Sequence, residues 1–139
     1  MCQKSLCLSE FAHLDLNKCI DTLVYGTTVR MIKNKNKNKT PAVFVFSLCE
    51  DNFNELQWIQ KHKNKLKKMD LGMISSVSHY NKLKNETKPL SYDYNLILEI
   101  MYGKNQRLVL LFDDFYKKEL FWCGLRHFID KQSLDEITM

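Results

Sequence analysis

Glycine is scarce in this chain and is nowhere clustered. A loop that wraps the phosphates of a nucleotide needs several glycines within a few positions, because only they let the backbone approach the phosphate oxygens closely. The spacing therefore excludes a nucleotide-binding loop of that kind. The four glycines are Gly26, Gly72, Gly103 and Gly124.

The chain also lacks the cysteine and histidine patterns that are typical of metal or catalytic sites. Its five cysteines are odd in number and form no C-x-x-C pair, which argues against a disulfide framework and against zinc. The four histidines lack metal-ligand spacing, and none lies beside a group that would make a nucleophile with its base. We therefore expect no metal, no cofactor and no catalysis, and we interpret Cys49 and Cys123 as small core residues.

No apolar run approaches the roughly 18 residues needed to cross a bilayer, and the first residues lack the apolar core of a secretory signal. A cysteine near a terminus can nevertheless be S-acylated, which makes Cys2 and Cys7 candidates for a lipid anchor. Residue 2 is not glycine, so the sequence as given lacks the signature of N-myristoylation. We expect a cytoplasmic protein that associates peripherally with the cytosolic face of membranes.

What the chain does have is the size and composition of one globular domain. At 139 residues it can bury roughly two-thirds of the surface that its unfolded form exposes. Hydrophobic residues make up 45% of the chain, as in ordinary globular proteins. We predict an N-terminal segment with a short helix at residues 1–21, one domain at 22–131 and a C-terminal tail at 132–139.

Alternating and β-branched apolar segments predict a mostly β domain with some α-helix. We expect a short N-terminal helix that Ser9 caps, followed by six strands. Gly26 marks a bulge or a close approach within the first strand, and Gly103, Lys104 and Asn105 turn the chain between the last two. The expected strands span residues 22–33, 42–48, 55–60, 73–80, 95–102 and 107–112.

An amphipathic helix is expected after the last strand. Asp113 or Asp114 can cap it, because an acidic side chain is favoured at the positive end of the helix dipole. Its apolar residues recur at spacings of three, four and seven, whereas Glu119, Arg126 and His127 fall on the opposite side. Such a helix can close one end of a small barrel with a large side chain and leave the other end free to bind. The apolar residues are Phe121, Trp122, Leu125, Phe128 and Ile129, of which Trp122 is the largest.

The basic residues are concentrated in two lysine runs on either side of the hairpin predicted at residues 42–60. The first run spans residues 33–39, and the second begins at Lys61 and continues to Lys67 and Lys68. The formal net charge is +5, so this uneven distribution can create a local basic patch. Successive connections of an up-and-down sheet alternate between its ends, which brings both runs to one rim. The same alternation over six strands brings the last hairpin turn there too. The candidate anion-binding residues are Arg30, Lys33, Lys35, Lys37, Lys39, Lys61, Lys63, Lys65, Lys104 and Arg107.

Five segments, taken in order, match a known family. They are Leu23 with Gly26 and Val29, Phe44 to Leu48, Leu56 to Trp58, residues 70–77, and Phe121 to Leu125. They resemble the first three strands, the lead into the fourth strand and the C-terminal helix of pleckstrin-homology domains, particularly those at the front of phosphoinositide-specific phospholipases C. The resemblance implies an antiparallel β-barrel or sandwich of six to seven strands, capped by the C-terminal helix.

The size of the chain, its N-terminal cysteines and its Asn/Lys bias are also similar to those of the acylated pleckstrin-homology domain proteins of apicomplexan parasites. That resemblance implies recognition of phosphatidic acid on secretory organelles and a part in regulated exocytosis.

The positions of the basic residues favour one class of lipid. Members of the family that bind phosphoinositides carry basic residues late in the first strand and early in the second, whereas this chain has Arg30 and Lys33 on the first but the uncharged residues 40–43 at the second. We therefore expect a monomer whose flexible lysines bind phosphatidic acid or a general anionic surface. The alternatives are a phosphoinositide-binding or protein-interaction adaptor and, less favoured because Phe44, Phe46 and Trp58 are expected to be buried, a nucleic-acid module.

Overall fold

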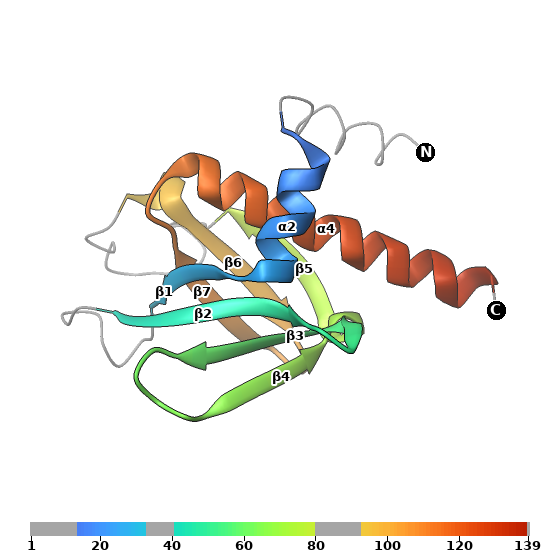
Figure 1. Cartoon of the computed structure of the whole chain (residues 1–139), viewed down its shortest axis with the longest axis horizontal. Helices are drawn as coiled ribbons and strands as arrows, with labels where there is room; N and C mark the ends of the chain where they lie inside the picture. Colours follow the sequence, from blue (N-terminus) through green and yellow to red (C-terminus); the bar gives the residue numbers. More distant parts are fainter. Residues whose placement is uncertain (1–13, 33–40, 80–92, 139) are drawn as a thin grey trace.

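A computed structural model describes residues 14–32, 41–79 and 93–138 of the chain. Seven antiparallel strands in these ranges form one sheet in the order β4-β3-β2-β1-β7-β6-β5, and two helices cross each other over one side of it (Figure 1). The mostly β architecture, the short N-terminal helix and the C-terminal helix are as predicted. The strands are β1 (Thr27–Met31), β2 (Ala42–Cys49), β3 (Asn52–Gln60), β4 (Leu66–Asp70), β5 (Ile74–His79), β6 (Ile97–Tyr102) and β7 (Gln106–Leu111). The helices are α2 (Leu16–Tyr25) and α4 (Phe115–Thr138), with 3-10 turns η2 (Leu71–Met73) and η3 (Tyr94–Leu96).

The sheet folds into two halves, β1 to β4 and β5 to β7. Every neighbouring pair is antiparallel, so β4 and β5, each three steps from β1, run in the same direction. The chain therefore rounds a corner at η2 without reversing. The seam between the halves is short, because the register of β1 with β7 spans only Arg30 opposite Leu111 and Met31 opposite Leu110. The result is a small barrel that is only partly closed.

The strand β4 is absent from the sequence prediction, which located six strands. Of its five residues only Met69 is buried, so the segment carries almost no apolar signal. It is an edge strand, and its two lysines are the kind of residue that discourages pairing with another chain.

Aromatic side chains fill the space between the two halves of the sheet. Phe121 of α4 is fully buried and meets Phe46 edge-on, with 6.2 Å between the ring centroids. Phe46 in turn stacks on Trp58 at 5.3 Å. Trp122 is buried as predicted, but its ring lies against His79 of β5 at 4.6 Å. The side chain that closes the centre of the barrel is therefore Phe121, not Trp122.

Helix α2 differs from the prediction at both of its ends. Its N-cap is Asp15, whose carboxylate accepts a hydrogen bond from the Asn17 backbone at 2.9 Å, whereas Ser9 lies outside the described residues. The helix continues to Tyr25, so residues 22–25 are helical where we predicted strand. Gly26 follows with φ at +102°, a value that an L side chain rarely adopts, and it packs against Val45. We expected a bulge or a close approach within a strand, whereas Gly26 lies at the end of a helix and its positive φ is what calls for glycine.

The two helices touch at Gly124. A Cβ atom added there would collide with the carbonyl oxygen of Cys19 and would lie 2.7 Å from Cδ2 of Leu23. Cys19 and Leu23 are both fully buried and lie one helical turn apart, on the face of α2 that meets α4. The absence of a side chain at Gly124 therefore lets the backbones of α2 and α4 approach each other.

Helix α4 buries more of its circumference than its apolar pattern indicates. Asp114 caps it as predicted, accepting from the Lys117 backbone at 2.8 Å. Glu119, which we expected to face solvent, is only 7% exposed, and Lys118 is fully buried. The Lys118 ammonium lies 2.7 Å from Nδ1 of His79 and donates to the Asn95 carbonyl at 2.9 Å. This satisfied lysine ties α4 to the end of β5 and to η3. The helix runs on to Thr138, through the segment that we assigned to a tail.

Cys49 is buried and Cys123 is half-buried against the core, and both are free thiols. In the described residues, no helix combines the length and the apolar composition that would let it cross a membrane.

Candidate functional site

Two connections between strands, β1–β2 and β3–β4, lie at one end of the barrel. The registers place the end of β1 beside the start of β2 and the end of β3 beside the start of β4. The β6–β7 turn lies instead beside the corner at η2, because Ile74 pairs with Tyr102 and the Gly103 backbone donates to the Met73 carbonyl at 3.0 Å. Strands β6 and β7 still reach the space between the two halves of the sheet, where their residues line one pocket with Lys67. We use the term open end for the last residues of β1 and β3, the first residues of β2 and β4, and this pocket.

Exposed lysines gather at the open end. Lys61, Lys63 and Lys65 lie in the connection between β3 and β4, and Lys67 follows on β4 itself. Lys104 is exposed as well, but its β6–β7 turn lies beside the corner at η2 and not with these lysines. The opposite end of the β2–β3–β4 meander is acidic, with Glu50, Asp51, Glu55 and Asp70. Positive charge is therefore separated from negative charge along these strands, which directs polyanions toward the open end.

The two predicted arginines do not face the interior of the barrel. Arg30 is exposed, but it alternates with the buried Val29 and Met31 and so lies on the outer face of β1. The Arg107 guanidinium lies 3.1 Å from the carboxylate of Glu99, whose side chain is only 8% exposed. This ion pair reduces the attraction of Arg107 for another anion. The remaining candidates, Lys33, Lys35, Lys37, Lys39, Cys2 and Cys7, lie outside the described residues.

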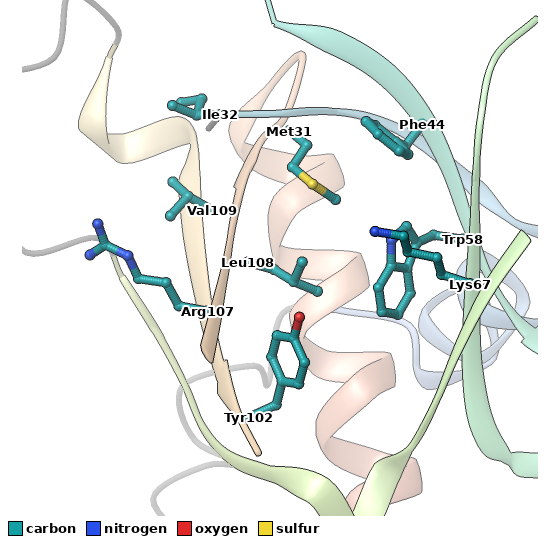
Figure 2. Close-up of a pocket in the computed structure, with 9 residues that line it drawn as sticks. All are labelled: Met31, Ile32, Phe44, Trp58, Lys67, Tyr102, Arg107, Leu108 and Val109. Carbon is teal, nitrogen blue, oxygen red and sulfur yellow. The ribbon is translucent and has the colours of Figure 1, made fainter. Parts of the chain in front are cut away.

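A pocket of about 300 Å³ lies at the open end, where β1 and β7 separate. Figure 2 shows Leu108 near its centre, with the Tyr102 hydroxyl and the Lys67 side chain directed toward it from different strands. Arg107 points away from the centre in the same view. Lys67 stands directly opposite Trp58 in the β3–β4 pair, so both side chains project from the same face of the sheet. The lining residues are Met31, Ile32, Phe44, Trp58, Lys67, Tyr102, Arg107, Leu108 and Val109.

Sequence reasoning missed Lys67 and Tyr102 as site residues. Lys67 was assigned to a connection within the second lysine run, because strand β4 was not predicted. The direction of a side chain in a connection cannot be predicted from the sequence. The alternation of a strand would have indicated the direction of Lys67. Met69 is buried, and Lys67 lies two residues before it, so both side chains project from the same face of β4. Tyr102 lies within the strand predicted at residues 95–102 and packs against the core, but it was not considered as a ligand contact.

Among the described residues, no group of three or more His, Cys, Asp and Glu side chains could hold a metal ion. The open end presents ammonium groups, the phenol of Tyr102 and apolar side chains, beside the ion-paired Arg107.

No protein-family model matches the sequence, and no curated protein does. Solved structures match the fold. The structure of Inner Membrane Complex Sub-compartment Protein 1 from Toxoplasma gondii is 13% identical, with a TM-score of 0.64 over 83% of this chain and 90% of that one. The PH domain from PfAPH is 16% identical, with a TM-score of 0.58 over 86% and 92%. The PH domain from TgAPH is 13% identical, with a TM-score of 0.58 over 85% and 91%.

These three likenesses cover nearly the whole of each structure at low identity, so they bear on architecture. They agree with the element order described above, in which a seven-stranded antiparallel sheet is followed by a long C-terminal helix. The chain has the pleckstrin-homology fold.

Proposed function

We propose that the protein is a non-catalytic module that binds anionic phospholipid headgroups at a membrane surface through its open end. The observation that supports this most directly is the gathering of Lys61, Lys63, Lys65 and Lys67 around an exposed leucine. Each lysine near an anionic membrane contributes about 1 kcal/mol to binding. Leu66, which is 48% exposed, lies between two of them and can enter the apolar boundary of the lipid layer while they remain at the headgroups.

Phosphatidic acid is the headgroup that this surface suits best. A stereospecific grip on inositol phosphates calls for donors fixed in position, and the forked guanidinium of arginine supplies them better than lysine does. At the open end Arg30 faces outward and Arg107 is paired with Glu99, while β2 begins at the uncharged Ala42. Flexible ammonium groups instead surround a small, highly charged phosphomonoester from several sides. Phosphoinositide binding is the runner-up, because the same lysines would attract it less selectively.

The structural neighbours support a place at a membrane. Two of them carry the inner membrane complex in their names, and two others are PH domains of the proteins called APH. The sequence resemblance to acylated pleckstrin-homology domain proteins completes the proposal, in which the protein is a monomer at the cytosolic face of a secretory organelle, with a part in regulated secretion. Acylation of Cys2 or Cys7 would strengthen such attachment, since one weak surface contact rarely holds a protein at a membrane alone.

Sedimentation with vesicles tests the headgroup and the surface together. Phosphatidylcholine vesicles that contain phosphatidic acid, phosphatidylserine or a phosphoinositide at equal total charge are compared at two salt concentrations. We expect the tightest binding to phosphatidic acid and weaker binding at higher salt. Changing Lys61, Lys63 and Lys65 to Gln removes about 3 kcal/mol, so the vesicle concentration needed for half-binding should rise about a hundredfold.

The matched control removes three exposed lysines from the helices, as Lys18→Gln, Lys117→Gln and Lys131→Gln. It changes the net charge equally, so unchanged binding of this control would locate the effect at the open end. Equal loss in both triple variants would show a response to net charge alone and contradict the proposed surface. Binding to a single-stranded oligonucleotide but to none of the vesicles would replace the lipid function with a nucleic-acid one.

A further inference from the structure

We propose that the pocket at the open end receives one alkyl chain of an anionic amphiphile, whose charged head remains at Lys67 and Tyr102. The inference rests on the proposed function, since it assigns the apolar part of the same lipid a place in the protein. It goes beyond headgroup recognition, because it predicts that part of the lipid leaves the bilayer for the barrel.

The walls of the pocket combine apolar side chains with the polar groups of Lys67, Tyr102 and Arg107. Met31, Phe44, Trp58 and Leu108 are each 5–7% exposed, whereas residues deeper in the barrel, such as Phe46 and Leu110, are fully buried. These four largely buried side chains therefore leave a narrow strip of carbon surface at the mouth of the barrel. A phosphate group alone would leave that surface wet and would itself lose water against it, which is unfavourable. An alkyl chain covers the same surface favourably.

The size of the pocket selects for a single chain. About 300 Å³ is at the lower limit of ordinary ligand pockets, which span about 300–1,000 Å³. Two acyl chains and a glycerol would exceed it. Each methylene that the protein buries should tighten binding about fourfold. The gain should stop once the chain fills the pocket, and this limit separates an enclosed site from adsorption on an open surface.

The polar residues of the pocket complement an anionic head. Lys67 and Tyr102 come from β4 and β6, on opposite halves of the sheet, and Figure 2 shows both directed toward the space above Leu108. Arg107, the other cation of the lining, is held by Glu99 at 3.1 Å. Lys67 is therefore the cation that meets the head, and the phenol of Tyr102 can donate a hydrogen bond to a phosphate oxygen. A neutral alkyl chain would leave both groups without a role.

Calorimetry on the wild-type chain tests the pocket without a membrane. Butyl, hexyl and octyl phosphate are titrated below their micelle concentrations, beside inorganic phosphate and octyl glucoside. We expect about fourfold tighter binding per added methylene up to a plateau, and no measurable binding of inorganic phosphate or octyl glucoside. Equal binding of inorganic phosphate and octyl phosphate, or no binding of either, would overturn the inference. The chain has two tryptophans, so a Trp122→Phe variant makes Trp58 the reporter of chain entry by fluorescence.

Two substitutions place the ligand within the pocket. Leu108→Phe fills the space and should weaken octyl phosphate binding at least tenfold, whereas Leu120→Phe, the same exchange at a residue that does not line the pocket, should leave it unchanged. Because Leu108→Phe could also disturb the core, Lys67→Met provides a second variant at an exposed position, and it should weaken octyl phosphate about tenfold. If both keep wild-type affinity, the ligand binds elsewhere and the inference is wrong. Vesicle binding without octyl phosphate binding would refute the pocket and leave the proposed function standing, and the reverse result would refute the proposed function.

Discussion

Replacing Gly124 by alanine tests the contact between α2 and α4, because the contact determines whether the exchange raises or lowers the free energy of unfolding. In an isolated helix the exchange stabilises, because alanine is favoured over glycine by about 1 kcal/mol. Here the new methyl group would meet the Cys19 carbonyl oxygen, which is part of the backbone of α2 and cannot rotate away. Overpacking costs about 1–3 kcal/mol, and the upper value applies because a whole helix must move. The expected net effect is a loss of about 2 kcal/mol of unfolding free energy.

Urea unfolding followed by circular dichroism measures this loss, and thermal unfolding should show a midpoint about 8 °C lower for a domain of this size. Lys131→Ala is the matched control, because Lys131 is an exposed residue of the same helix and its exchange should change stability by less than about 0.5 kcal/mol. A Gly124→Ala variant that is more stable than the wild type would show that helix propensity dominates. The two helices would then not touch at this residue.

Three further changes probe single interactions. Asp114→Ala should cost about 1 kcal/mol in urea unfolding through loss of the helix cap, and Asp113→Ala, at an exposed residue, should cost less; equal losses would contradict the cap. Burial raises the pKa of the Cys19 thiol from 9.0 to about 12, so iodoacetamide should modify it about a thousandfold more slowly than a free thiol, as followed by peptide mass spectrometry; modification at the free-thiol rate would contradict its burial. Burial lowers the pKa of Lys118, against the attraction of Glu119 and Asp93. The folded state then holds fewer protons than the unfolded state below pH 10.5, so the stability of the wild type relative to Lys118→Met should rise as the pH approaches that value; a difference independent of pH would contradict this.

The sequence predicts those elements whose burial is decided by their own residues. β6 alternates Leu98, Ile100 and Tyr102 on its inner face, and all three pack in the core as expected. The segment from Thr22 to Tyr25 was predicted wrongly, because its β-branched and aromatic residues indicate a strand. It is helical because Leu23 packs against a glycine on a helix a hundred residues later in the chain, which no local pattern reports. Tertiary contact decides the conformation of this segment over its intrinsic propensity.

The hydrophobic pattern of the sequence also could not predict the burial of charged side chains. Lys118 and Glu119 have the side chains least often found inside a protein, so any periodic analysis assigns them to the solvent. Lys118 is inside because an imidazole, a backbone carbonyl and the rings of Phe115 and Trp122 surround its ammonium group. Partners of this kind come from separate elements of the fold, and their convergence can be found only from coordinates.

The directions of the last three strands depend on a corner that the sequence pattern does not show. The predicted strand count lacked β4 and its reversal of direction, and it replaced the corner at η2 by a reversal that the chain does not make. The two omissions cancel in the directions of β5, β6 and β7, but they hide the corner itself. The corner is fixed by Asp70, whose carboxylate accepts from the Gly72 backbone at 2.7 Å and from Gln132 of α4 at 3.0 Å. The β6–β7 turn lies against the same corner, because the Gly103 backbone donates to the Met73 carbonyl at 3.0 Å. The final helix therefore helps to hold the corner from which β5 continues in the direction of β4, and with it the position of Lys104.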